Sequence, residues 1–146
     1  MLAFLLLELG NMTTYKQAAT AIAWVIFFHI LGMIALYSWY PYYDVPMHFG
    51  GGVAMAVLAL ALWDNNVINV NLVSKKKWPQ LVFYTLCVLG FVALVGIGWE
   101  WGEFLLDQLA TVRQQWGLAQ TSVADTLADL FFDLLGAMCV ILWRKL

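Results

Sequence analysis

The sequence predicts an all-α integral membrane protein in which four transmembrane helices form one bundle, with a short interfacial helix at the N-terminus. Hydrophobic residues make up 64% of the 146 residues and charged residues only 11%, whereas soluble domains carry about 25% charged residues. The apolar stretches are long and lack the alternation of barrel strands, so helices must satisfy the backbone in lipid. The size fits a single transmembrane domain over residues 1–146.

Four apolar stretches are long enough to cross a bilayer, since a hydrocarbon core of about 30 Å requires about 20 helical residues. They cover about residues 17–40, 45–63, 80–109 and 122–143. Residues 1–9 are mostly apolar but too short to cross, and they contain no basic residue that could form the n-region of a signal peptide. We therefore expect an interfacial helix there rather than a signal peptide.

Positive charge predicts the orientation of these spans. Lys16, the lysines at 75–77, Arg144 and Lys145 all fall on one side of a four-span bundle, and only Arg113 falls on the other. The positive-inside rule makes the lysine-rich side cytoplasmic. We therefore expect both termini in the cytoplasm.

Seven of the nine carboxylates lie at the opposite, outward-facing end of the predicted spans, together with His48. These carboxylates are Asp44, Glu100, Glu103, Asp107, Asp125, Asp129 and Asp133. Residues three or four apart share one face of a helix, so the spacing gives each of three helices a single polar stripe. Because ionisable side chains are costly near lipid, such a set predicts a functional site.

This set of side chains favours a divalent metal ion, because carboxylates with an imidazole are ligands that Zn²⁺, Mg²⁺ or Mn²⁺ accept. The expected ligands are Asp44, His48, Glu100, Asp125, Asp129 and Asp133. Protonated carboxyl groups or a water-filled cavity are the alternatives. The sequence indicates no organic cofactor.

At about 1.5 Å per residue Asp133 lies about 15 Å above Trp143, and His29 reaches a similar depth, where it could serve as a relay.

Structural roles are the alternative for several of these residues. Asp125 has the spacing of a capping box opened by Ser122, and Asp107 could be a solvated loop acid. Asp44 could be a turn residue before Pro46. His29 could be a hydrogen-bonded packing residue.

Glycines accompany the polar stripes and predict close helix approach around the site. These glycines are Gly50, Gly51, Gly52, Gly98, Gly102 and Gly136. For Gly90 and Gly96 we expect ordinary helix packing.

Three motifs together resemble a known group of proteins. They are Asp44-x-x-x-His48-Phe49-x-Gly51-Gly52, Trp99-Glu100-x-x-Glu103, and Asp125-x-x-x-Asp129-x-x-x-Asp133-x-x-Gly136-Ala137. They are similar to the small bacterial membrane proteins grouped around VanZ, and more closely to the YjdF-like inner-membrane group. The resemblance implies a bacterial inner-membrane protein. VanZ is associated with teicoplanin resistance, which implies an envelope or lipid-linked setting.

The favoured function is metal-dependent hydrolysis or group transfer on a membrane lipid or lipid-linked substrate that enters from the outer leaflet. We expect Glu103, Glu100 and Asp133 to be catalytic, with Glu103 as general base, and Arg113 and Asp107 to bind substrate. Proton or cation transport or sensing is one alternative, and a non-catalytic partner subunit is another. The net charge of −2 and the lack of a basic stripe argue against nucleic-acid binding. A homo-oligomer is compatible with all of these functions.

Overall fold

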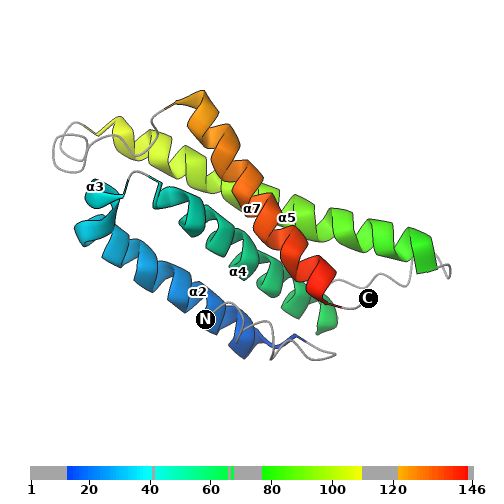
Figure 1. The fold of residues 1–146 in the computed structure, drawn as a ribbon. Helices are drawn as coiled ribbons and strands as arrows, with labels where there is room; N and C mark the ends of the chain where they lie inside the picture. The colour runs from blue at the N-terminus through cyan, green and yellow to red at the C-terminus, as the bar shows by residue number, and fades with distance from the viewer. Residues whose placement is uncertain (1–12, 41, 66, 68–76, 110–121, 145–146) are drawn as a thin grey trace.

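The protein is helical throughout the part of the chain that the computed structural model describes, which is residues 13–40, 42–65, 67, 77–109 and 122–144. The elements in chain order are α2 (Tyr15–Leu31), a π-helical turn η1 (Gly32–Leu36), α3 (Tyr37–Trp39), α4 (Asp44–Asp64), α5 (Lys77–Asp107) and α7 (Val123–Trp143) (Figure 1). The interfacial helix expected over residues 1–9 lies outside the described residues and stays a prediction.

Within the described residues, four helices are long and apolar enough to cross a membrane. They are Tyr15–Leu36, Asp44–Asp64, Trp78–Asp107 and Val123–Trp143. The four-span prediction is therefore confirmed, with boundaries that shift by a few residues. The first span ends at Leu36 with the π-helical turn, and the short helix α3 continues the chain to Trp39.

Side-chain caps explain where two of the helices begin. Thr14 precedes α2, and its hydroxyl accepts a hydrogen bond from the Gln17 backbone N–H, while the Gln17 side chain accepts one from the Thr14 backbone. Ser122 accepts from the backbone N–H of Asp125 at the start of α7. Such caps satisfy backbone donors that the first helical turn leaves without partners.

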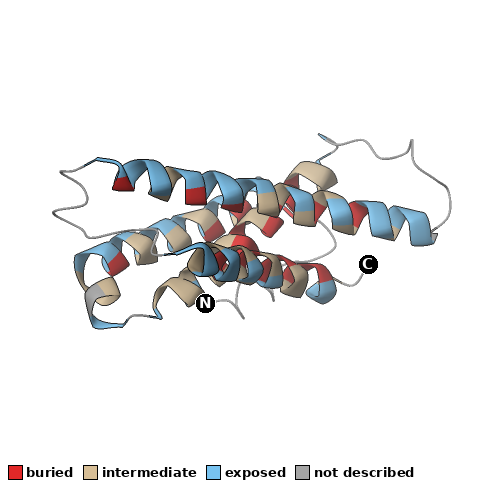
Figure 2. Cartoon of the chain, turned by 90° about the horizontal axis from the view of Figure 1, so that it is seen from above, coloured by how far each residue is buried: buried red, intermediate tan, exposed pale blue. Residues whose placement is uncertain are grey.

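Helix α4 is the centre of the bundle and packs against α2, α5 and α7 (Figure 1). In the most apolar 18-residue stretch of α4, 50% of the residues are buried inside the bundle. In the corresponding stretch of the first span, only 11% are buried. Figure 2 shows buried residues on the helix faces that meet and exposed residues on the outer faces. Large apolar side chains such as Leu94 and Leu142 are exposed there, as expected where the surrounding medium is lipid.

Two glycines allow α4 and α7 to touch through their backbones. A Cβ atom on Gly52 would overlap the main-chain carbonyl of Asp133, and one on Gly136 would overlap the main-chain oxygen of Phe49. This pair of contacts confirms the close approach predicted for Gly52 and Gly136 and holds the polar stripes of the two helices together.

On α5 the glycine prediction is wrong. A Cβ on Gly98 or Gly102 would meet open space, whereas a Cβ on Gly96 would lie 2.5 Å from Asp133 Oδ2 and 3.0 Å from Leu130 Cδ2. Positions two apart on a helix point in nearly opposite directions. The inward face of α5 therefore carries Gly96, and the glycines at 98 and 102 face away from the contacts made there.

A polar clasp closes the other end of the bundle, and the sequence analysis missed it. The Asp64 carboxylate accepts from Arg144 Nη2 at 2.6 Å and from the Thr13 backbone N–H at 2.5 Å. Arg144 Nη1 donates to the Tyr84 hydroxyl at 3.3 Å. The clasp, defined as Thr13, Asp64, Tyr84 and Arg144, joins all four spans at the end remote from His48.

We predict that Gly52→Ala or Gly136→Ala lowers the free energy of unfolding by about 1–3 kcal/mol, because the added methyl forces two packed backbones apart. Gly98→Ala is the matched control, since its methyl meets open space and alanine favours a helix by about 1 kcal/mol over glycine. The measurement is reversible unfolding in mixed detergent micelles. Equal effects of Gly52→Ala and Gly98→Ala would show that the close approach does not contribute.

We also predict that Arg144→Met lowers the free energy of unfolding by about 3 kcal/mol, because it leaves a buried carboxylate without its cation. The Asp64 side chain is only 6% exposed. The same unfolding assay measures the effect. Lys16→Met, which removes an exposed cation, should change the free energy by no more than about 0.5 kcal/mol. The same loss in both variants would argue against the clasp.

Candidate functional site

The imidazole of His48 is the centre of the carboxylate cluster. His48 lies on α4 and is 7% exposed. Its Nε2 atom faces Asp44 Oδ1 at 3.7 Å, Glu100 Oε1 at 3.9 Å and Asp129 Oδ1 at 3.9 Å. Helices α4, α5 and α7 thus each bring a carboxylate to one ring nitrogen, as the shared polar stripes predicted.

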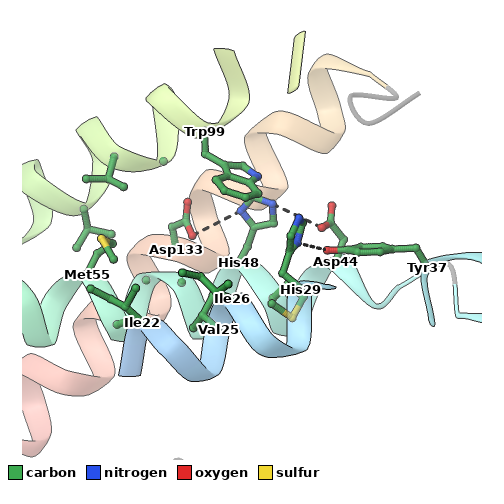
Figure 3. Close-up of a pocket in the computed structure, with 17 residues that line it drawn as sticks. Ile22, Val25, Ile26, His29, Tyr37, Asp44, His48, Met55, Trp99 and Asp133 are labelled. Carbon is green, nitrogen blue, oxygen red and sulfur yellow. Dashed lines mark hydrogen bonds and ion pairs between the residues drawn. The ribbon is translucent and has the colours of Figure 1, made fainter. Parts of the chain in front are cut away.

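The opposite ring nitrogen faces a single carboxylate. His48 Nδ1 lies 3.5 Å from Asp133 Oδ1, and Figure 3 shows Asp133 and Asp44 on different sides of the ring. The two ring nitrogens therefore have different surroundings, with three carboxylates around Nε2 and one at Nδ1.

Helical spacing positions these groups. Helix α4 begins at Asp44, so Asp44 lies in its first turn, and His48 lies one turn further along the same face. This placement differs from the alternative of a turn residue before Pro46. Asp129 and Asp133 are likewise one turn apart on α7 and are 4% and 6% exposed. Each helix thus presents its polar stripe to the centre of the bundle.

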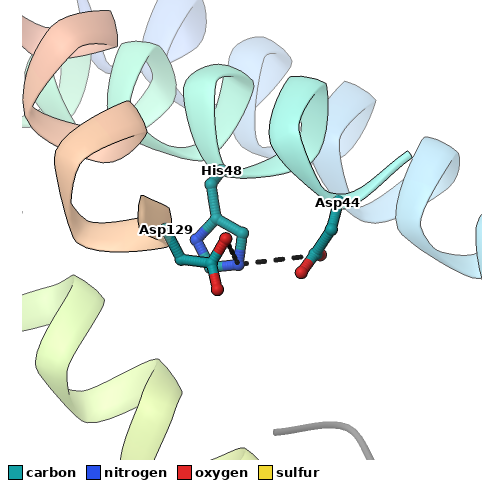
Figure 4. Close-up of side chains that lie close together, drawn as sticks. All are labelled: Asp44, His48 and Asp129. Carbon is teal, nitrogen blue, oxygen red and sulfur yellow. Dashed lines mark ion pairs between the residues drawn. The ribbon is translucent and has the colours of Figure 1, made fainter. Parts of the chain in front are cut away.

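Three of these residues could share one metal ion. A ligand atom from each of Asp44, His48 and Asp129 lies within 4.8 Å of the other two (Figure 4). The distances from His48 Nε2 are longer than hydrogen bonds. Two ligands that each bind one ion at about 2.1 Å lie about 3–4 Å apart, so small shifts would bring all three atoms into coordination range.

The other predicted site residues lie around this group. Glu100 is 3% exposed and reaches His48 Nε2 from α5. Asp125 sits in the first turn of α7, where its backbone N–H takes part in the Ser122 cap, and it is not one of the three potential ligands. Asp107 is the last residue of α5 and is 8% exposed, which contradicts a solvated loop acid. Arg113 lies outside the described residues.

Glu103 is oriented by Trp99, which the sequence analysis quoted within a motif but gave no role of its own. Trp99 Nε1 donates to Glu103 Oε1 at 2.7 Å, one helical turn away. The same indole packs nearly perpendicular to the His29 ring, with ring centroids 5.1 Å apart. The spacing of four residues between Trp99 and Glu103 was the available signal, because it places both on one face of α5.

His29 has a hydrogen-bond partner in Tyr37, which was also missed. His29 Nδ1 lies 3.0 Å from the Tyr37 hydroxyl (Figure 3). Tyr37 follows the first span. Burial raises the pKa of its phenol above the ordinary value, and the carboxylates of Asp44 and Glu103 raise it further. The phenol therefore stays neutral and links His29 to the edge of the cluster. This contact agrees with a hydrogen-bonded histidine, the alternative reading of His29.

The π-helical turn accounts for the position of Tyr37. Gly32–Leu36 adopts this wider turn between His29 and Tyr37, and such bulges are frequent at functional sites. A Cβ on Gly32 would lie 2.6 Å from the Tyr43 ring and 2.7 Å from the Tyr37 ring. The glycine thus leaves room for both tyrosines beside α2.

The fold and the site together define a helical, multi-pass membrane protein with a polar cluster of carboxylates and a histidine inside the bundle. The chain belongs to the family described as "Predicted membrane protein (DUF2238)", whose model matches residues 1–146. This membership confirms the prediction of a membrane protein. A comparison with curated proteins and one with solved structures both found no match.

Proposed function

We propose that this protein is a membrane metalloenzyme whose divalent ion is held by His48 with Asp44 and Asp129, and with Glu100 as a further ligand. The observation that carries the proposal is the convergence of carboxylates from three helices on His48 Nε2, at 3.7–3.9 Å. A divalent ion bound at Nε2 would explain why these carboxylates converge there.

The reason is charge balance in a medium of low polarity. One imidazole faces four carboxylates, and Glu100, Asp129 and Asp133 are each no more than 6% exposed. Even a protonated histidine carries only one positive charge. Burying ionised carboxylates is costly unless a cation offsets them. A divalent ion beside Nε2 would supply two positive charges where three of the carboxylates meet.

The donor set fits a borderline or hard divalent ion. One imidazole nitrogen and carboxylate oxygens suit Zn²⁺, Mn²⁺ or Mg²⁺. Neither of the two cysteines, Cys87 and Cys139, is among the three potential ligands. The described residues therefore favour oxygen and nitrogen coordination over thiolate coordination.

Asp133 would act on the ion through His48. Metal-binding histidines commonly donate their second ring N–H to a carboxylate, which fixes the tautomer and the ring orientation. Asp133 lies on the Nδ1 side at 3.5 Å and so stands where that carboxylate is needed. We assign Asp133 this positioning role in place of direct coordination.

The reaction class we propose is hydrolysis or group transfer on a membrane lipid or lipid-linked envelope substrate. A bound divalent ion supplies polarisation of a phosphoryl or ester oxygen. Glu103, held by the Trp99 indole at 2.7 Å, would serve as general base. Arg113 and Asp107 would bind the polar part of the substrate, and His29 with Tyr37 would relay a proton. The resemblance to VanZ-like and YjdF-like proteins supports an envelope setting in the bacterial inner membrane.

We further propose that the clasp end of the bundle faces the cytoplasm and the His48 end faces outward, on the distribution of lysine and arginine. Between the two ends the interior is closed by apolar side chains. Val57, Leu60, Val88 and Val140 are each at most 2% exposed. A polar site that stops above such a core fits a one-sided enzyme better than a transport path through this chain.

We predict that purified protein contains a divalent metal and that Asp129→Asn and His48→Gln reduce its content to background. Each variant removes one ligand, so binding is lost. Mass spectrometry of the metal measures the content. In the wild type, free metal at 100 times its Kd should raise the free energy of unfolding by about 2.7 kcal/mol.

Glu103→Gln is the matched control, because it removes the proposed base and leaves the proposed ligands in place. It should keep the metal and lose the reaction, which is followed by mass spectrometry of envelope lipids from cells that overproduce each variant. A wild type without metal, or metal content that is unchanged in both ligand variants, would contradict the proposal.

We predict that Asp133→Asn weakens metal affinity by about 10- to 100-fold without abolishing it, because the ring of His48 loses its charged hydrogen-bond partner. Isothermal titration with Mn²⁺ or Zn²⁺ measures the affinity. Nitrogen NMR of labelled His48 should show a changed tautomer balance in the metal-free variant. Unchanged affinity together with an unchanged tautomer would remove the positioning role.

A further inference from the structure

A cavity of about 390 Å³ lies beside the cluster and is almost wholly apolar along its length (Figure 3). His48, Asp44, His29 and Tyr37 line one end. The remaining wall is formed mainly by aliphatic side chains and two methionines, Met47 and Met55, together with the Trp99 ring and the Asp133 carboxyl beside His48. Examples are Ile22, Val25, Met55, Val92 and Val95. An apolar chamber is thus joined to a polar end.

The cavity lies between two helices that stand on either side of α4. Its floor is α4, where Gly51, Gly52 and Ala54 leave room. One wall is α2 and the other is α5. Ile26 on α2 is 53% exposed and Val95 on α5 is 39% exposed, so the rims face the medium around the bundle. Because these residues lie within the spans, that medium is hydrocarbon.

The length of the cavity matches one leaflet. Its lining follows α4 from Asp44 to Met55, and eleven residues of helix rise about 16 Å. Half of a hydrocarbon core is about 15 Å. The polar end lies at the start of α4 and the apolar end near the middle of the span, which is the order of headgroup and chain in a lipid.

The width admits a single chain. A volume of about 390 Å³ over about 16 Å of length gives a mean cross-section of about 24 Å². A cavity of this cross-section is wide enough for one extended hydrocarbon chain. A helix from a second copy has a diameter of about 10 Å or more with its side chains and would not fit.

We propose that this cavity binds one hydrocarbon chain of a membrane lipid, which enters sideways between α2 and α5 and places the junction of chain and headgroup beside His48. The inference deepens the proposed function by naming the substrate as an amphiphile held by one chain. It rests on that function only for the chemistry at the polar end. Chain binding itself depends on the apolar walls.

The test uses the full-length protein in vesicles of phosphatidylethanolamine and phosphatidylglycerol, with a phosphatidylglycerol that carries a photoreactive diazirine midway along one acyl chain. After illumination, peptide mass spectrometry locates the label. We expect labelling of Met55, which lies at the deep end of the cavity. Ile26→Trp and Val95→Trp, which fill the opening from opposite walls, should each reduce Met55 labelling several-fold.

Neighbouring residues provide matched controls. Phe27 and Leu94 are 54% and 72% exposed and do not line the cavity, so Phe27→Trp and Leu94→Trp should leave Met55 labelling at the wild-type level. The result that overturns the inference is Met55 labelling that is absent, or unchanged in both filling variants. A cross-link from Met55 to a second copy of the chain would also overturn it.

Metal content, measured on the same samples, separates the two proposals. Wild-type protein that labels at Met55 but holds no metal contradicts the metal centre and leaves the chain site standing. Protein that holds metal but does not label at Met55 contradicts the chain site alone. The tryptophan variants should keep wild-type metal content, since none of them replaces a proposed ligand.

Discussion

The constraint on which this structure depends is the burial of several carboxylates around one imidazole inside an apolar bundle. His48 brings Asp44, Glu100 and Asp129 to one ring nitrogen and Asp133 to the other. Ionised groups are stable at such a depth only when opposite charge or hydrogen bonds compensate the lost hydration. The need for compensation explains both the crowding of the stripes and the proposal of a divalent ion.

The rest of the bundle serves this arrangement. Backbone contact at Gly52 and Gly136 holds α4 against α7, which sets the distance between His48 and the two aspartates of α7. The clasp around Asp64 and Arg144 ties the spans at the remote end, and a cavity lies between α2 and α5 toward the His48 end. The cavity formed there joins the surrounding hydrocarbon to the polar cluster. A site of this kind suits a substrate with one polar and one apolar part.

Sequence reasoning predicted the helical spans and the grouping of the acids, because both follow from local rules of length and helical period. Helical spacing places Gly96 on the face of Glu100, four residues away, but the sequence analysis assigned Gly98 and Gly102 to the site because they flank Glu100 along the chain. The structure shows the reverse, since Gly96 is the glycine that packs against Asp133, and Gly98 and Gly102 face open space. In the sequence, Arg144 served only to indicate the orientation of the spans. Its partner Asp64 is 80 residues away, and no local sequence pattern predicts such a contact. The π-helical turn that positions Tyr37, and the assignment of Asp133 to Nδ1, likewise required three-dimensional structure.

The central claim is that His48 and the carboxylates around it form a metal site, and X-ray absorption spectroscopy of the zinc-loaded protein tests it most directly. The account predicts one imidazole nitrogen and carboxylate oxygens at about 2.0–2.2 Å, with no sulfur, and loss of the imidazole signal in His48→Gln. A spectrum that contains no imidazole, or one that His48→Gln leaves unchanged, would contradict the account.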